Sequence, residues 1–161
     1  MINTAVEKEY GNRLRCRVGG IYIENDQILL VNHSGLNAEN TFWAPPGGGL
    51  EYGESAPEAL VREFKEETGL RITIEDFLCC TEYLKPPLHA LEVFFRVDKA
   101  GGILKTGSDP EVGIDEQIIQ NVKFLSFEQL RQISASNKHN ILHKVSNASD
   151  IIRMKGYLKL P

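Results

Sequence analysis

The protein has 161 residues, with 18 Lys and Arg against 22 Asp and Glu, which gives a formal net charge of −4 at pH 7. Hydrophobic residues make up 42% and charged residues 25%, a composition typical of folded globular domains and not of disordered or fibrous chains. The mild acidity argues against duplex nucleic acid as a partner, because no basic excess is available to displace phosphate counterions. We therefore expect one folded domain over residues 1–161.

The sequence lacks the patterns of an export signal or a membrane anchor. Its first residues do not combine a charged stretch with an apolar one. No apolar stretch approaches the roughly 18 residues that a membrane span needs. The three cysteines are odd in number, and the adjacent Cys79 and Cys80 lie in an apolar run, which favours packing in a reduced compartment over disulfide formation. We expect a cytoplasmic protein without membrane contact.

The first third of the chain predicts a β-hairpin followed by an irregular loop. Branched apolar residues at 17–23 and 28–31 flank an Asn-Asp turn, which is typical of a hairpin. Residues 45–49 contain two prolines and three glycines, so we expect no regular structure there. Without side chains to shield it, the backbone of this loop can approach a ligand closely.

The helix expected over residues 55–68 has signals at both of its ends. Ser55 and Glu58 form a capping-box pattern, and Pro57 lies in the first turn, where proline is tolerated. Gly69 follows directly and is suited to a left-handed cap. These signals make this helix the most strongly specified element of the sequence.

The second half of the chain mixes strand and helix patterns. The expected elements are strands over residues 71–83, 90–98 and 118–124 and helices over residues 126–133 and 137–153. A Gly- and Asp-rich loop is expected over residues 99–115, and loops of this length are often functional. Together these patterns predict a single α/β or α+β domain.

Three glutamates of the helix over residues 55–68 lie on or near its apolar face. On a helical wheel, Glu67 lies about 20° from Leu60, which marks the centre of the apolar stripe. Glu63 and Glu66 lie about 60° and about 120° round on the same flank. Carboxylates this close repel one another, so the protein must protonate them, pair them with basic groups or bind a cation.

The basic residues of this helix are not expected to neutralise the three acids. Arg62 and Lys65 fall on the opposite, solvent-facing side of the wheel. Carboxylate oxygens together with a nearby backbone carbonyl form the hard-oxygen environment that Mg²⁺ or Mn²⁺ prefers. The pattern therefore favours a divalent metal site, and the alternative is an ordinary solvated face rich in glutamate.

Residues 48–70 resemble the complete Nudix box. The residues that match its nine specified positions, over 23 residues of chain, are Gly48, Glu54, Arg62, Glu63, Phe64, Glu66, Glu67, Gly69 and Leu70. The likeness extends to the hairpin before the box and to the strand and helix pattern over residues 116–130. The resemblance implies a Nudix-type α/β/α sandwich with a mixed β-sheet. It also implies a hydrolase that uses Mg²⁺ or Mn²⁺ to cleave a nucleoside diphosphate linked to another moiety.

The resemblance assigns a metal-binding role to the acids of the helix. Carried over by position, Glu63, Glu66 and Glu67 would be metal ligands. Gly47 or Gly48 would offer a backbone carbonyl to the metal, a role that suits residues without a side chain. The metal would neutralise the diphosphate and lower the pKa of the attacking water.

Two further roles follow from the resemblance. Glu54 and Arg62 would form an internal ion pair that ties the loop to the helix, a structural role. The base that takes a proton from the attacking water is open between Glu66 and Glu116, and a solvated loop acid is the alternative for Glu116. Other acids of the same loop are Glu111 and Asp115.

The substrate is less well specified than the reaction. Pro86 lies sixteen residues after Leu70, a spacing that resembles the proline marker of ADP-ribose pyrophosphatases, although it also fits a simple turn. We expect a small-molecule nucleotide of the ADP-ribose or nucleotide-sugar type. A MutT-like activity on nucleoside triphosphates is the alternative, and so is a nucleotide-sensing module without turnover. The resemblance allows a homodimer, and no sequence feature requires one.

The arginines near the start of the chain support two interpretations. Arg13, Arg15 and Arg17 alternate along a predicted strand. They fit contacts to phosphate, and they fit the polar face of a strand equally well. The sequence does not decide between the two.

Overall fold

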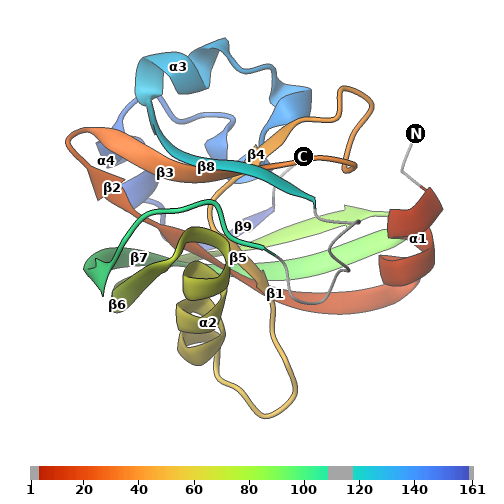
Figure 1. The fold of residues 1–161 in the computed structure, drawn as a ribbon. Coiled ribbons are helices and arrows are strands. Elements are labelled where there is room, and N and C mark those ends of the chain that lie inside the picture. Colours follow the sequence, from red (N-terminus) through yellow and green to blue (C-terminus); the bar gives the residue numbers. More distant parts are fainter. Residues whose placement is uncertain (1–3, 109–117, 160–161) are drawn as a thin grey trace.

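A computed structural model describes residues 4–108 and 118–159 and shows a mixed α/β fold (Figure 1). Its elements are α1 (Thr4–Tyr10), β1 (Arg13–Ile21), β2 (Ile23–Glu24), β3 (Gln27–His33), β4 (Phe42–Ala44), β5 (Gly47–Gly49), α2 (Ala56–Thr68), β6 (Leu70–Lys85), β7 (Leu88–Gly102), β8 (Ile119–Ser126), α3 (Phe127–Gln132), the 3₁₀ turns η2 (Ala135–Asn137) and η3 (Asn140–Leu142), α4 (Ala148–Ile152) and β9 (Gly156–Lys159). The predicted α/β fold class is confirmed.

The strands form two sheets. The five-stranded sheet has the order β5-β1-β7-β6-β9, and it is mixed because β1 pairs with β7 and β6 with β9 in parallel. In the four-stranded sheet, β3 pairs antiparallel with β2, β4 and β8. The mixed sheet implied by the sequence resemblance is therefore present, with a second sheet beside it.

The core has two parts, one toward α2 and one toward the C-terminal helices. Leu60 and Phe64 of α2 pack in one cluster with residues of β1, β3, β6, β7 and β8. Phe94 of β7 packs in the other cluster with residues of α3, η3 and α4. Gly20 and Gly19 of β1 mark the two faces, because an added Cβ would overlap Phe64 at Gly20 and Phe94 at Gly19. Figure 1 shows α2 on one side of the strands and α3 on the other.

Helix α2 is formed as its sequence signals predict. The Ser55 side chain accepts a hydrogen bond from the Glu58 backbone N–H, and the Glu58 side chain accepts one from the Ser55 backbone N–H. Gly69 caps the other end in the left-handed conformation, with φ 74°. Across the part of the chain that the structure describes, no helix is long and apolar enough to cross a membrane.

The glycine-rich segment after β4 is a strand, not the irregular loop that its composition predicts. Gly47, Gly48 and Gly49 form β5, which pairs antiparallel with Gly19, Val18 and Arg17 of β1. Glycine weakens a strand but does not forbid it when a neighbouring strand supplies the hydrogen bonds. This pairing fixes the backbone of β5 beside α2.

The predicted hairpin is present around Asn25 and Asp26, both with positive φ, although its first strand is split. β1 belongs to the five-stranded sheet, whereas β2 alone pairs with β3. The long strands are longer than expected, since β6 reaches Lys85 and β7 reaches Gly102.

The prediction of one continuous helix over residues 137–153 is wrong. This segment contains η3, the short helix α4 and turns between them. Asn147 caps α4 through the Asp150 backbone N–H and so starts a new helix inside the segment that we expected to be continuous. The helix expected over residues 126–133 is confirmed as α3, with Ser126 as its cap.

Candidate functional site

The three glutamates of the box lie where α2 packs beside β5. The side chain of Glu67 is buried, with an exposed fraction of 8%, and those of Glu63 and Glu66 are partly buried, with exposed fractions of 14% and 27%. The inward position that the helical wheel gave to Glu67 and Glu63 is thus observed. Burial makes repulsion between these carboxylates stronger than it would be on an open helix surface.

Glu67 contacts the glycine strand and a histidine. Its Oε2 accepts a hydrogen bond from the Gly47 backbone N–H at 2.9 Å, and its Oε1 lies 3.7 Å from His33 Nε2. The Nδ1 atom of His33 is buried and has no hydrogen-bond partner among the residues described. The sequence analysis did not identify His33, and its only signal was a polar residue at the end of an apolar strand.

Arg62 does pair with the acids of its own helix, which corrects the expectation that it points away from them. Its Nη1 donates to Glu63 Oε1 at 3.0 Å and to Glu66 Oε2 at 3.3 Å. The helical wheel gives the direction of the Cβ atom, whereas the long arginine side chain bends back along the helix surface. Lys65 remains exposed, as expected.

Arg62 also joins α2 to the segment before it. Its Nε and Nη2 donate to the two carboxylate oxygens of Glu54, both at 3.0 Å. Nη2 further donates to the Gly49 backbone carbonyl at 3.3 Å. A guanidinium that bonds both oxygens of a carboxylate holds its geometry firmly, so this contact fixes β5 and the following loop against α2.

The charges of this cluster are not balanced. Burial and the neighbouring Glu67 raise the pKa of Glu63 to about 7, even though Arg62 acts in the opposite direction. The hydrogen bond from Arg62 lowers the pKa of Glu54, and the same bond raises the pKa of Arg62. One guanidinium is therefore shared among more carboxylates than it can neutralise.

The residues of this site suit a hard divalent cation in their chemistry. Carboxylate oxygens of Glu67 and Glu63 lie beside the backbone of β5, and Glu66 shares the Arg62 Nη1 group with Glu63. A Cβ added at Gly48 would overlap the Glu63 carboxylate, so only glycine lets this acid lie against the strand. As these side chains are placed, no group of three or more His, Cys, Asp or Glu residues within 4–108 and 118–159 converges enough to hold a metal ion.

A second charged cluster lies on the face of the five-stranded sheet opposite α2, and most of it was not expected from the sequence. The Arg17 Nε donates to Glu92 Oε2 at 2.9 Å, and His139 Nε2 lies 3.5 Å from Glu92 Oε1. Burial alone would raise the pKa of Glu92, but His139 and Arg17 lower it to about 2. A lone glutamate inside the apolar strand over residues 90–98 was the signal that could have revealed this cluster.

One predicted site residue cannot be placed. Glu116, the candidate base outside the box, lies outside the described residues, together with Glu111 and Asp115. Glu66, the other candidate, lies at the site, where it accepts a hydrogen bond from Arg62.

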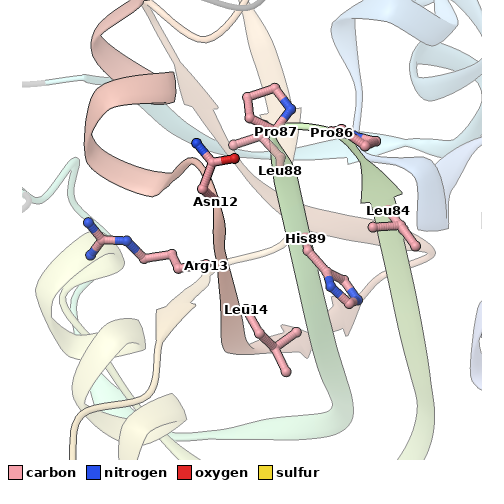
Figure 2. Close-up of a pocket in the computed structure, with 8 residues that line it drawn as sticks. All are labelled: Asn12, Arg13, Leu14, Leu84, Pro86, Pro87, Leu88 and His89. Atoms are coloured by element: carbon pink, nitrogen blue, oxygen red, sulfur yellow. The ribbon is translucent and has the colours of Figure 1, made fainter.

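The hollow beside Pro86 is separate from the glutamates. Figure 2 shows Pro86 and Pro87 at the turn between β6 and β7, beside Leu88, with His89 and Leu14 farther along the strands. None of the box residues lines this hollow. Arg13 pairs with Leu88 at this end of β1, four residues before Arg17, or roughly 13 Å along the strand. The proline that suggested an ADP-ribose substrate therefore does not touch the acidic cluster.

Comparison with known families gives one match that covers most of the chain. The model of the family described as NUDIX domain matches residues 13–145. The match includes β5, α2 and both charged clusters.

Individual relatives are more distant and longer than this chain. An ADP-ribose pyrophosphatase from Methanocaldococcus jannaschii is 38% identical over 94 residues, which cover 57% of this chain and 55% of that protein. The 8-oxo-dGDP phosphatase NUDT18 from Homo sapiens is 30% identical over 126 residues, which cover 78% of this chain and 36% of that protein. The chain thus spans about half, or less, of the length of these relatives.

The fold itself has close counterparts among solved structures. A NUDIX hydrolase from Nitrosomonas europaea matches with a TM-score of 0.66 at 22% sequence identity, covering 81% of this chain and 84% of that one. Likeness at this level of identity concerns the fold alone.

Proposed function

Since this chain belongs to the NUDIX domain family, we propose that it is a metal-dependent pyrophosphohydrolase that cleaves a nucleoside diphosphate linked to another moiety and releases a nucleoside monophosphate. The observation that carries the proposal is the group of buried and partly buried glutamates where α2 packs beside β5, in which burial and the neighbouring Glu67 raise the pKa of Glu63 to about 7. A protein gains nothing in stability from such a group, so a role in binding a cation explains it best.

Glu63, Glu66 and Glu67 would hold Mg²⁺ or Mn²⁺, together with a backbone carbonyl of Gly47 or Gly48. The bound cation would neutralise the charge of the diphosphate and lower the pKa of the attacking water. Arg62 compensates part of the acidic charge of the protein and keeps Glu63 and Glu66 turned toward the site. Its bidentate bond to Glu54 holds it there during turnover.

A carboxylate must also orient the attacking water or take its proton. Glu66 is a candidate because it lies at the rim of the cluster and is 27% exposed, so water reaches it. Glu116 remains the candidate outside the box. Separate Gln substitutions of these two residues identify the base, since the loss of the base lowers kcat more than it weakens metal binding.

The substrate that we favour is of the ADP-ribose or nucleotide-sugar type. The relative from Methanocaldococcus jannaschii, at 38% identity, is named an ADP-ribose pyrophosphatase. The second candidate is a MutT-like activity on nucleoside triphosphates. It is supported by a relative from Streptomyces ambofaciens named a MutT-like protein, which is 30% identical over 92 residues, or 57% of this chain.

The experiment is a hydrolysis assay of the full chain with Mg²⁺ against ADP-ribose, a nucleotide sugar and a nucleoside triphosphate. Release of a nucleoside monophosphate from ADP-ribose or from the nucleotide sugar supports the proposal. Hydrolysis of the triphosphate alone supports the MutT-like alternative. Tight binding without turnover of any compound shows a nucleotide sensor and contradicts both enzyme hypotheses.

A matched pair of variants tests the role of the glutamates. Glu67→Gln should lower kcat/KM by about 100-fold or more, and it should weaken Mn²⁺ binding measured by electron paramagnetic resonance. Lys65→Gln, an exposed change on the same helix, should stay within about twofold of the wild type in both measurements. Normal turnover by a folded Glu67→Gln protein contradicts the metal-binding role.

A further inference from the structure

Arg17 lies in a row of residues that crosses the five-stranded sheet next to the glutamates. In the registers of β5, β1 and β7, Gly49 is opposite Arg17, and Arg17 is opposite Glu92. Residues opposite one another in neighbouring strands share a face of the sheet. Gly48 faces the Glu63 carboxylate, so Gly49 and Arg17 face the other way, toward the side of Phe94 and His139.

The Arg17 guanidinium makes one hydrogen bond within the described residues, through Nε, and most of its N–H donors are unused there. Only Nε bonds to Glu92, at 2.9 Å, and neither Nη1 nor Nη2 has a hydrogen bond within the described part of the chain. The side chain is 30% exposed, so it is partly withdrawn from water. Arg96 on β7 makes the more usual structural pair, with both Nε and Nη2 at 2.9 Å from Asp76.

An open position lies on the neighbouring strand, directly opposite Arg17. A Cβ added at Gly49, directly opposite Arg17, would meet no atom within 4 Å among the described residues. The planar guanidinium presents its two Nη groups in a fork that matches the oxygens of a phosphate. An open position beside such a fork suits an anion.

The Arg17 cluster and the glutamate cluster belong to one electrostatic site. Glu92 first, and then Glu67 and Glu63, raise the pKa of Arg17 against the effect of its burial. The carboxylates of Glu67 and Glu63 therefore form part of the electrostatic environment of Arg17. A ligand at the glutamates is therefore within the field of Arg17.

We propose that Arg17 binds a phosphate group of the substrate through its Nη groups, and that Glu92, itself held by His139, is the positioning residue that aims them. This inference rests on the proposed pyrophosphohydrolase function and adds a specific phosphate contact to it. Glu92 fixes Nε and thereby the plane of the guanidinium, leaving the two Nη groups to donate to non-bridging phosphate oxygens. The position of Arg17 opposite Gly49 places this contact on the face of β5 away from Glu63.

The test compares Arg17→Gln with Arg96→Gln, which removes an arginine from an ion pair of the same sheet outside both clusters. For the hydrolysed substrate, Arg17→Gln should raise KM by about 10- to 100-fold and change kcat less. It should not weaken Mn²⁺ binding, because it removes a positive charge from beside the glutamates. Arg96→Gln should keep the KM of the wild type. An unchanged KM in Arg17→Gln overturns the inference.

Direct binding separates a failure of this inference from a failure of the proposed function. Calorimetry with inorganic pyrophosphate and Mg²⁺ needs no turnover, so it remains informative even if no substrate in the panel is hydrolysed. Arg17→Gln should bind pyrophosphate about 10-fold or more weakly than the wild type, and Arg17→Lys, which keeps the charge without the fork, should lie between them. Equal affinity in all three proteins, or no binding by the wild type, overturns the inference.

The positioning role of Glu92 has its own readout. Glu92→Gln should raise KM in a protein that keeps Arg17, and it should add little to the effect of Arg17→Gln in the double variant. Such non-additivity is expected when one residue acts through another. Fully additive effects on KM show that Glu92 does not act through Arg17 and overturn its positioning role.

Discussion

The glutamate cluster on the α2 side of the five-stranded sheet has an excess of acidic groups, whereas the Arg17 cluster on the other face has an excess of basic groups. On the side of α2, Arg62 is shared by Glu54, Glu63 and Glu66, and the pKa of Glu63 rises to about 7. On the other side, the single carboxylate of Glu92 faces two basic side chains, and its pKa falls to about 2. The α2 side has more carboxylates than Arg62 can neutralise. On the other side, the Nη groups of Arg17 make no hydrogen bond within the described residues.

This difference explains how one narrow strand can serve a site for a metal and a diphosphate. On the proposed function, the excess of carboxylates on one face would stabilise a cation, and the guanidinium on the other face would stabilise an anion. Glycine at all three positions of β5 keeps side chains from separating the two faces. Substitutions in the two clusters should therefore change stability in opposite directions as the pH changes.

The largest expected effect concerns Glu92 and the loss of folding stability at low pH. Because the pKa of Glu92 in the folded state, about 2, lies below its ordinary value of 4.5, this group stabilises the fold above pH 4.5. That contribution, about 3 kcal/mol, is lost as the pH falls from 4.5 toward 2. Glu92→Gln should therefore be less stable at pH 7 and should lose less stability on acidification. Urea unfolding at pH 7, 5 and 3.5 measures both effects, and parallel curves for the two proteins contradict the prediction.

Glu63 should behave in the opposite way. Its pKa in the folded state, about 7, lies above the ordinary 4.5, so its contribution to stability is present below pH 4.5 and is lost as the pH rises through 7. In the presence of EDTA, Glu63→Gln should be more stable than the wild type by about 2 kcal/mol at pH 8, after allowance for solvent screening. The two proteins should be nearly equal at pH 5. A variant that is less stable than the wild type at pH 8 shows that Arg62 already balances this cluster.

A smaller effect, on the affinity for Mn²⁺, is expected when a glycine of β5 is replaced by alanine. Gly48→Ala would displace the Glu63 carboxylate, and we expect Mn²⁺ affinity to fall about tenfold. Gly49→Ala makes the same change one residue later, where the new Cβ meets no described atom within 4 Å. Its Mn²⁺ affinity should stay within about twofold of the wild type. Equal losses in the two variants, measured by electron paramagnetic resonance, mean that the strand backbone and not the Glu63 carboxylate sets metal affinity.

The sequence was sufficient for features that depend on residues close together in the chain. Helix α2 is capped by Ser55 at its start and by Gly69 at its end, as their signals predict, because a cap involves residues within four positions of one another. The inward direction of Glu67 also follows from helix geometry alone. The α/β fold class and the likeness to the Nudix box follow from these local signals and their spacing.

Features that depend on distant partners could not be predicted from one sequence. β5 is a strand only because β1, about thirty residues earlier, supplies its hydrogen bonds. Arg17 and Glu92 are 75 residues apart, and His139 reaches them from the segment between η2 and η3, which has no periodic pattern. The direction expected for the Arg62 side chain was wrong because a helical wheel does not describe where the end of a long side chain lies.

The smallest effect that we predict concerns the bond that holds α2 to the loop after β5. Glu54→Gln removes the bidentate partner of Arg62 and leaves the guanidinium bonded to Glu63, Glu66 and the Gly49 carbonyl. We expect a loss of about 1 kcal/mol in the free energy of unfolding and a fall of about fivefold in kcat, because the loop loosens while Glu63, Glu66 and Glu67 remain.

Glu51→Gln is the matched control for this change, since Glu51 lies in the same loop but is 60% exposed and 3.9 Å from Arg62. It should leave stability and kcat close to those of the wild type. The comparison with Glu67→Gln then distinguishes a structural role from a role in the reaction, because Glu67→Gln should lose activity without losing stability. If Glu54→Gln abolishes turnover while its free energy of unfolding is unchanged, Glu54 takes part in the chemistry, and the balance of charge on the α2 side must be redrawn with Glu54 among the metal-binding acids.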